Sequence, residues 1–260
     1  MFLEPVQYAL GALSGGLVGL TLGLFGGGGS ILAVPLMVYL VGVPNAHLAI
    51  GTSAVSVAVN AVTGLASHAR NGTVKWRCAA IFSVAGVLGA FFGSSLGKAL
   101  DGSHLLLLFA GLMLVVGMLM FRSRQDGGDP AAACTRDNAP KVLGFGGGTG
   151  LLSGFFGIGG GFLIVPGLVA STGMPMINAI GSSLVAVTAF GMTTAISYAL
   201  SGMVDWPLAF VFIVGGIVGG LGGSRAALLL QKRKGALNMS FALMIVAVAG
   251  YMVWRNLQGV

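Results

Sequence analysis

Two glycine runs hold the residues of this sequence best suited to binding a ligand. One lies in LFGGGGSILAVP at Leu24–Pro35, the other in FFGIGGGFLIVP at Phe155–Pro166. Consecutive glycines break a helix, and at membrane depth the freed backbone must be satisfied by protein, ligand or a water-filled cavity. Backbone N–H groups exposed together favour an anion. We therefore expect an anion site here, the alternative being glycines that only allow close helix crossing. Its expected residues are Gly26, Gly27, Gly28, Gly29, Ser30, Gly157, Gly159, Gly160 and Gly161.

Hydroxyl groups follow each run at matching places, in Gly51–Ser53 and Gly181–Ser183. A hydroxyl can donate to a substrate oxygen without carrying charge, so we expect these groups to contribute to the same site. Bonding back to their own helix is the alternative. The hydroxyl residues concerned are Thr52, Ser53, Ser182 and Ser183, and weaker candidates for the site are His47, Asn60 and Thr188.

The composition is that of a membrane protein. Hydrophobic residues fill 56% of the 260 positions and charged residues 7%, with a mean hydropathy of +0.97. Soluble domains carry about 25% charged residues. We therefore expect an all-α polytopic membrane protein in the lipid bilayer, without a soluble catalytic domain. Glu4 and the absence of a basic segment before it argue against a cleaved signal peptide.

Titratable groups avoid the middle of the expected spans. A cation or proton pathway usually contains a carboxylate within the membrane, so we expect no cation carrier, and proton coupling would lack an obvious carrier group. His68 and His104 fall at segment ends, where an interfacial position is expected. The acidic residues all lie in loops or at chain ends: Glu4, Asp101, Asp126, Asp129, Asp137 and Asp205.

Several kinds of chemistry are excluded by what the spans lack. Cys78 and Cys134 fit neither a disulfide framework nor a metal cluster, and we expect no metal and no cofactor. An intramembrane enzyme would need a base beside a serine, which no span offers. The sequence also contains no Gly-Lys-Ser/Thr element, so direct use of ATP is not expected. We predict that the protein is not an enzyme.

The chain is duplicated. Pro35 and Pro166 lie 131 positions apart, and Trp76 and Trp206 lie 130 apart. We expect a first transmembrane repeat at 1–121, a cytoplasmic linker at 122–141 and a second repeat at 142–260, each with about five helical segments that are broken or re-entrant at the glycine run. The expected segments are Val6–Leu24, Ser30–Val41, Ala46–Ala69, Cys78–Leu100 and Leu105–Phe121, then Gly144–Phe156, Phe162–Ser171, Ile177–Leu200, a segment with Gly216, Gly219 and Gly223, and Asn238–Trp254.

Charge predicts how the two repeats are oriented. The loop after the third segment is basic in the first repeat, with Arg70, Lys75 and Arg77, but carries only Asp205 in the second. The loop after the fourth segment has the opposite bias, and +7 net charge is explained by such clusters rather than by nucleic-acid binding. We therefore expect inverted-topology repeats, with the linker inside the cell and both termini outside. The basic residues of that fourth loop in the second repeat are Arg225, Lys232, Arg233 and Lys234.

At these motifs the chain resembles the TauE/SafE family of membrane transporters, the sulfite exporters. The resemblance rests on the two glycine runs followed by proline, on Gly51–Ser53 and Gly181–Ser183, and on the tandem layout. It implies a secondary transporter of a small sulfur oxyanion, sulfite or an organosulfonate such as sulfoacetate, exported across the cytoplasmic membrane by alternating access. Ile158 interrupts the second run, so the half-sites differ. Another small anion, such as thiosulfate or a carboxylate, and a membrane scaffold without a substrate are the alternatives.

Overall fold

The chain is helical wherever its structure is described. The computed structural model describes residues 4–122, 128–129, 132, 134–135, 137–157, 161–230 and 236–257, and these contain no strand. Gly159 and Gly160 lie outside the described residues, as do Asp126 and the basic residues at 232–234. The expected all-α class is therefore confirmed for the described part of the chain. Five stretches in it are long and apolar enough to cross a membrane: Pro5–Leu40, Ala46–Arg70, Trp76–Lys98, Met176–Leu200 and Trp206–Leu230.

The helices follow the expected order with small shifts in their ends. The first half contains α1 (Pro5–Phe25), the short helices η1 (Gly26–Leu32), α2 (Ala33–Pro35) and η2 (Leu36–Leu40), and α3 (Ala46–Arg70), α4 (Trp76–Lys98) and α5 (Gly102–Arg122). The second half contains α6 (Ala139–Phe156), α7 (Gly161–Thr172), α8 (Met176–Leu200), α9 (Trp206–Leu230) and α10 (Ala236–Leu257).

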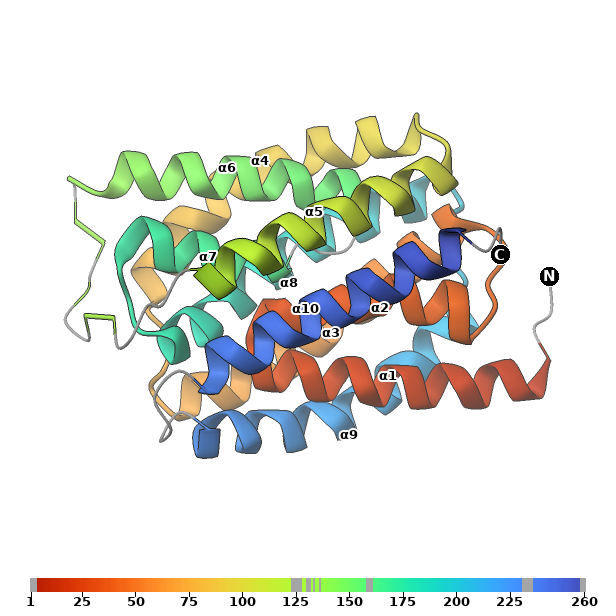
Figure 1. Ribbon diagram of the computed structural model, residues 1–260, viewed down its shortest axis with the longest axis horizontal. Helices are drawn as coiled ribbons and strands as arrows, with labels where there is room; N and C mark the ends of the chain where they lie inside the picture. Colours follow the sequence, from red (N-terminus) through yellow and green to blue (C-terminus); the bar gives the residue numbers. More distant parts are fainter. Residues whose placement is uncertain are drawn as a thin grey trace.

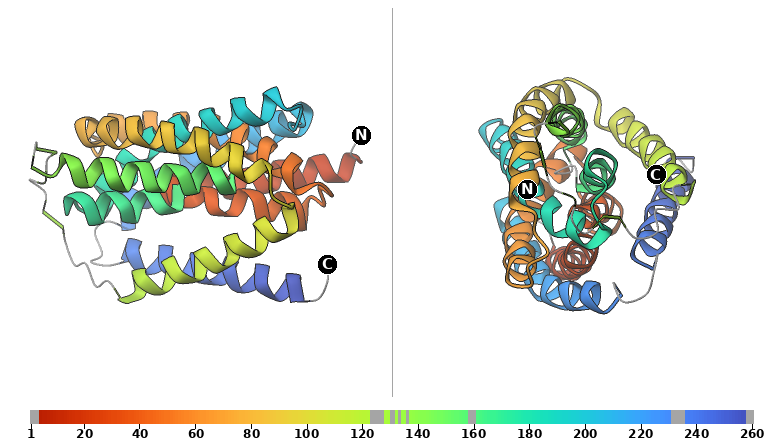
Figure 2. Two further views of the ribbon diagram at one scale, coloured as in Figure 1. Left: turned by 90° about the horizontal axis from the view of Figure 1, so that it is seen from above. Right: turned by 90° about the vertical axis from the view of Figure 1, so that its left-hand side faces the viewer.

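Both chain termini lie at one end of the bundle (Figure 1). We call this the terminal end, where α1 begins and α10 ends, and we call the opposite end, where α5 ends and α6 begins, the linker end. The pair formed by α5 and α10 lies to one side of the other helices (Figure 2). Because α3 and α8 run in opposite directions, the first turns of each lie beside the last turns of the other (Figure 1).

The first helix of each half ends at a glycine with positive φ. Gly26 has φ 60° and ends α1, and Gly157 has φ 66° and ends α6. A residue with a Cβ rarely adopts this conformation, so the runs begin where the backbone requires glycine. The same conformation recurs at two further pairs of positions, each 130 or 131 apart: Gly42 and Gly173, and Gly72 and Gly202.

Glycine faces join helices of different halves. α1 packs along α9, and α6 packs along α4. A Cβ on Gly19 would strike the backbone of Gly216, and one on Gly150 would strike the backbone of Gly86. The helices approach this closely because no side chain stands between them, as is common in membrane proteins.

One expectation about the cysteines is wrong. Cys78, near the start of α4, and Cys134 form a disulfide with their Cα atoms 5.3 Å apart. The two cysteines are 56 positions apart with no pairing signal between them, and only the return of residues 134–135 to the linker end of α4 brings the two thiols together.

Candidate functional site

The two glycine runs meet inside the bundle. Gly27 in η1 and Gly161 at the start of α7 are both buried. A Cβ built on Gly27 would lie 2.7 Å from the Cα of Gly161 and 2.6 Å from Cγ2 of Val187 in α8. Only glycine therefore fits at Gly27 in this arrangement, and the two runs touch through the backbones of Gly27 and Gly161.

A serine from α8 satisfies the backbone of the first run. The N–H of Gly27 donates to Oγ of Ser183 at 2.9 Å, and that hydroxyl donates to the carbonyl oxygen of Ile180 at 2.7 Å. Ser30 satisfies a second backbone group of the same run, because its hydroxyl donates to the carbonyl oxygen of Gly27 at 2.9 Å. Ser30 and Ser183 are fully buried. The structure thus places a backbone donor and two hydroxyls within one hydrogen-bonded chain.

The other expected hydroxyls have different partners. Ser53 donates to the carbonyl oxygen of Ile50 in its own helix at 2.9 Å. Thr52 accepts a hydrogen bond from the backbone N–H of Asp205 at 2.9 Å, and Ser182 accepts one from the backbone N–H of Lys75 at 2.8 Å. Ser53 therefore bonds back to its own helix, whereas Thr52 and Ser182 join the two halves.

The weaker candidates lie apart from Gly27. Thr188 donates to the carbonyl oxygen of Leu184 in its own helix at 2.8 Å. His47 lies at the terminal end with Nε2 3.0 Å from the carbonyl oxygen of Leu100. Asn60 is 2% exposed, and among the described residues neither atom of its amide has a hydrogen-bond partner. Each such buried group in a native structure needs an explanation, so Asn60 remains a candidate.

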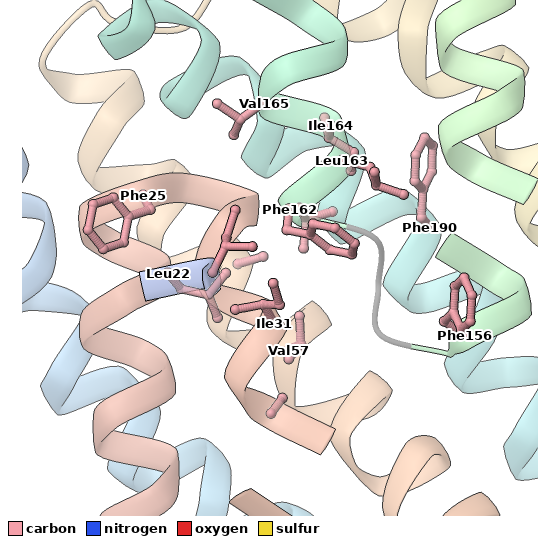
Figure 3. Close-up of a cluster of buried hydrophobic side chains, with 14 of the residues drawn as sticks. Leu22, Phe25, Ile31, Val57, Phe156, Phe162, Leu163, Ile164, Val165 and Phe190 are labelled. Carbon is pink, nitrogen blue, oxygen red and sulfur yellow. The ribbon is translucent and has the colours of Figure 1, made fainter. Parts of the chain in front are cut away.

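Hydrophobic side chains enclose the meeting point of the runs. Ile31 and Phe162, which follow the two runs, lie near Val57 of α3 in Figure 3. One cavity of about 350 Å³ lies between α5, α6 and α7 and is lined mainly by apolar groups, and another of about 400 Å³ lies at the terminal end beside His47. Neither cavity is lined by residues of the glycine runs. The described residues of the runs, Gly26–Ser30, Gly157 and Gly161, are buried in this structure.

His68 differs from the interfacial role expected for it. It is 1% exposed, with Nδ1 2.9 Å from Oγ1 of Thr73 and Nε2 3.1 Å from the carbonyl oxygen of Gly23. Position near a segment end suggested an exposed ring, but the loop after α3 folds back over it. The polar pairs Thr52–Asp205 and Lys75–Ser182 were also missed as contacts, although the spacing of 130 positions that relates them was visible in the sequence.

The sequence matches a known protein family and several membrane proteins. The sequence signature of the family described as "Sulfite exporter TauE/SafE" matches residues 11–252. A "Probable membrane transporter protein" of Xylella fastidiosa strain Temecula1 is 53% identical over 251 residues, which cover 94% of each chain. A protein of the same description from Haemophilus influenzae is 31% identical, over 77% of this chain and 79% of its own. "Probable membrane transporter protein YdhB" of Bacillus subtilis is 27% identical, over 83% and 89%. No solved structure shows a significant match.

Proposed function

The chain belongs to the sulfite exporter TauE/SafE family of membrane transporters, and we propose that it exports a small sulfur oxyanion across the cytoplasmic membrane. The proposed cargo is sulfite or an organosulfonate, moved by alternating access without ATP. The observation that carries the proposal is the bond from the N–H of Gly27 to Ser183, because it pairs a buried backbone donor with a hydroxyl that can rotate.

The proposed binding step exchanges two hydrogen bonds within the protein for two to the anion. At present the oxygen of Ser183 accepts from Gly27 while its proton points to Ile180. An incoming anion would accept the N–H of Gly27 in place of Ser183, whose hydroxyl would then turn to donate to the anion. Bonds to a charged acceptor are stronger than the neutral bonds they replace, which would offset part of the cost of removing water from the anion. The remaining residues of the two runs and Ser53 complete the proposed site.

Many transporters build alternating access on two equivalent halves of opposite orientation, and the helix packing supports such halves here. Positions 130 or 131 apart share positive φ, as Gly26 and Gly157 do. The packing partners of the two halves are also exchanged. Gly19 of the first half packs on Gly216 of the second, and the equivalent Gly150 of the second half packs on Gly86 of the first. We propose inverted repeats with the basic loops and the linker end inside the cell and both termini outside. The domain boundaries at 1–121, 122–141 and 142–260 follow from the same proposal.

Substitution of Ser183 tests the proposed site. Ser183→Ala removes one hydroxyl donor to the anion, and a bond to a charged group contributes about 1.5–3 kcal/mol. We expect sulfite affinity to fall by roughly 10- to 100-fold. The control is Ser95→Ala, since among the described residues the exposed Ser95 hydroxyl bonds only to the carbonyl oxygen of Phe91 in its own helix, at 3.1 Å.

The measurements are calorimetric binding and transport in proteoliposomes with sulfite, sulfoacetate, thiosulfate, sulfate and acetate. Tighter binding of sulfite or sulfoacetate than of acetate by the wild-type protein supports the proposed class of cargo. Binding that is equal in Ser183→Ala and Ser95→Ala would refute the site. Preference for thiosulfate or acetate would instead establish one of the other anion carriers.

A membrane scaffold that carries nothing is the second candidate, and one observation favours it. Gly27 and Gly161 are packed without space between them, as a purely structural helix crossing would be. A scaffold would bind none of the five anions and would leave every one of them untransported. Transport of any of them excludes it.

A further inference from the structure

Two hydrogen bonds between the halves are counterparts of each other. The backbone N–H of Asp205 donates to Oγ1 of Thr52 at 2.9 Å, and the backbone N–H of Lys75 donates to Oγ of Ser182 at 2.8 Å. Thr52 and Ser182 are 130 positions apart, and so are Lys75 and Asp205. Exchanging the two halves therefore converts one bond into the other. Thr52 lies in the second turn of α3 at the terminal end, and Ser182 lies in the second turn of α8 at the linker end.

Each bond holds a loop that is packed directly against the helix of the other half. The residue before Thr52 is Gly51, where a Cβ would strike the carbonyl oxygen of Met203. The residue before Ser182 is Gly181, where a Cβ would lie 2.7 Å from Oγ1 of Thr73. The loop that follows the long helix of one half thus rests on the first turns of the long helix of the other half, at both ends of the molecule. With both loops seated, the described residues of the two glycine runs are buried.

We infer that Thr52 and Ser182 are the latches of two gates that open in turn, an inference that rests on the proposed alternating access. When the gate at the terminal end opens, the bond from Asp205 to Thr52 breaks and the bond from Lys75 to Ser182 stays. When the gate at the linker end opens, the reverse occurs. Thr52 and Ser182 therefore act on the equilibrium between the two open forms rather than as ligands of the anion.

The two gates are held by different additional hydrogen bonds. At the linker end, Nδ2 of Asn178 donates to the carbonyl oxygen of Thr73 at 2.9 Å, and His68 bonds the Thr73 hydroxyl. The positions equivalent to Asn178 and Thr73 are Leu48 and Met203. Neither of these side chains carries an N–H or O–H group, so neither can supply the same bonds. At the terminal end, Nζ of Lys98 instead donates to the carbonyl oxygen of Ser197 at 3.2 Å and to Oγ of Ser201 at 3.1 Å, so each gate has additional bonds of its own.

Cysteine accessibility tests the inference in the full chain without any substrate. A single reporter, Ser30→Cys, is placed in the first glycine run after Cys78→Ser and Cys134→Ser remove the native thiols. Membrane vesicles of both orientations, identified by an N-terminal epitope, are treated with a membrane-impermeant maleimide. Loss of one hydrogen bond between neutral groups should shift the equilibrium by about fivefold.

Thr52→Val and Ser182→Ala should shift the labelling rate in opposite directions. Thr52→Val should raise labelling from the terminal side about fivefold, and Ser182→Ala should do the same from the linker side. Equal shifts on the same side, or no shift for both, would overturn the inference. Two controls change hydroxyls that bond only within their own helix, Thr193→Val and Ser95→Ala, and both should label like the parent protein.

A second pair of variants keeps the test decisive if either latch variant fails to fold. Gly51→Ala and Gly181→Ala push the same loops away by steric contact and should reproduce the same opposite shifts. The experiment is separable from the cargo: opposite shifts in a protein that binds none of the five anions would support the latches and refute the proposed cargo. Transport of a sulfur anion with unchanged labelling in all four variants would refute the latches and support the proposed cargo.

Discussion

Replacing Gly27 with alanine would test the contact on which the closed state depends. The added Cβ would lie 2.6 Å from Cγ2 of Val187 and 2.7 Å from both Cα and the carbonyl oxygen of Gly161, whereas ordinary van der Waals contact begins near 3.4 Å. The start of α7 must therefore retreat by about 0.7 Å. Overpacking of this kind costs about 1–3 kcal/mol, and backbone yields less easily than a side chain. At about 2 kcal/mol, the closed arrangement loses roughly 30-fold in population against any state that separates the runs.

Gly148→Ala provides the matched control, because Gly148 is an exposed position of α6 with no atom near its added Cβ. Alanine there should be neutral or stabilising by up to about 1 kcal/mol, the difference in helix propensity. Thermal unfolding in detergent and sulfite transport in proteoliposomes are measured for both variants. We expect Gly27→Ala to lower the unfolding midpoint and to slow transport at least tenfold. If it matched Gly148→Ala in both measurements, the tight crossing of the two runs would be refuted.

Two further predictions concern the cysteines and Asn60. If the linker end faces the cytoplasm, Cys78 and Cys134 should be free thiols in cells quenched with acid and should form their disulfide only after purification in air, since cytosolic disulfides are rare. A disulfide already present in the quenched cells would place that end outside instead. Asn60→Ala removes two buried polar atoms without described partners, so we expect the unfolding midpoint to rise. A lower midpoint would show that the amide has a partner in solution, such as water or the anion.

The helices could be predicted from the sequence because a helix that crosses the lipid bilayer must be apolar over a fixed length. A membrane-spanning helix needs about 20 apolar residues, and glycine and proline residues indicate where each helix ends. The expected third segment, Ala46–Ala69, differs from α3 by one residue at its end. The largest miss is α6, which begins at Ala139 rather than at the expected Gly144. Pro140 was assigned to the linker there, but proline is well tolerated in the first turn of a helix.

The partners of the candidate groups could not be predicted, because they depend on contacts between distant segments. The sequence placed Ser53 and Ser183 at equivalent positions, yet only Ser183 has a described glycine-run partner, the N–H of Gly27. It also placed Thr52 and Ser182 with the binding groups, whereas in the structure they bond to loops of the opposite half. A hydroxyl in a helix can turn toward its own backbone or toward a neighbour, and the choice is made by packing rather than by local sequence.

The sequence predicts a repeat, but the moving bodies of a transporter are defined by packing. α1 and α9 come from different halves and meet along backbone at Gly19 and Gly216, and α6 meets α4 in the same way. Helices locked this closely should move together, so under the proposed mechanism each moving body contains helices from both halves. The contacts expected to change then include the hydrogen bonds at Thr52, Ser182 and Ser183. Alternating access in this chain would thus depend in part on three hydroxyl groups of α3 and α8, which lie outside the α1–α9 and α4–α6 pairs.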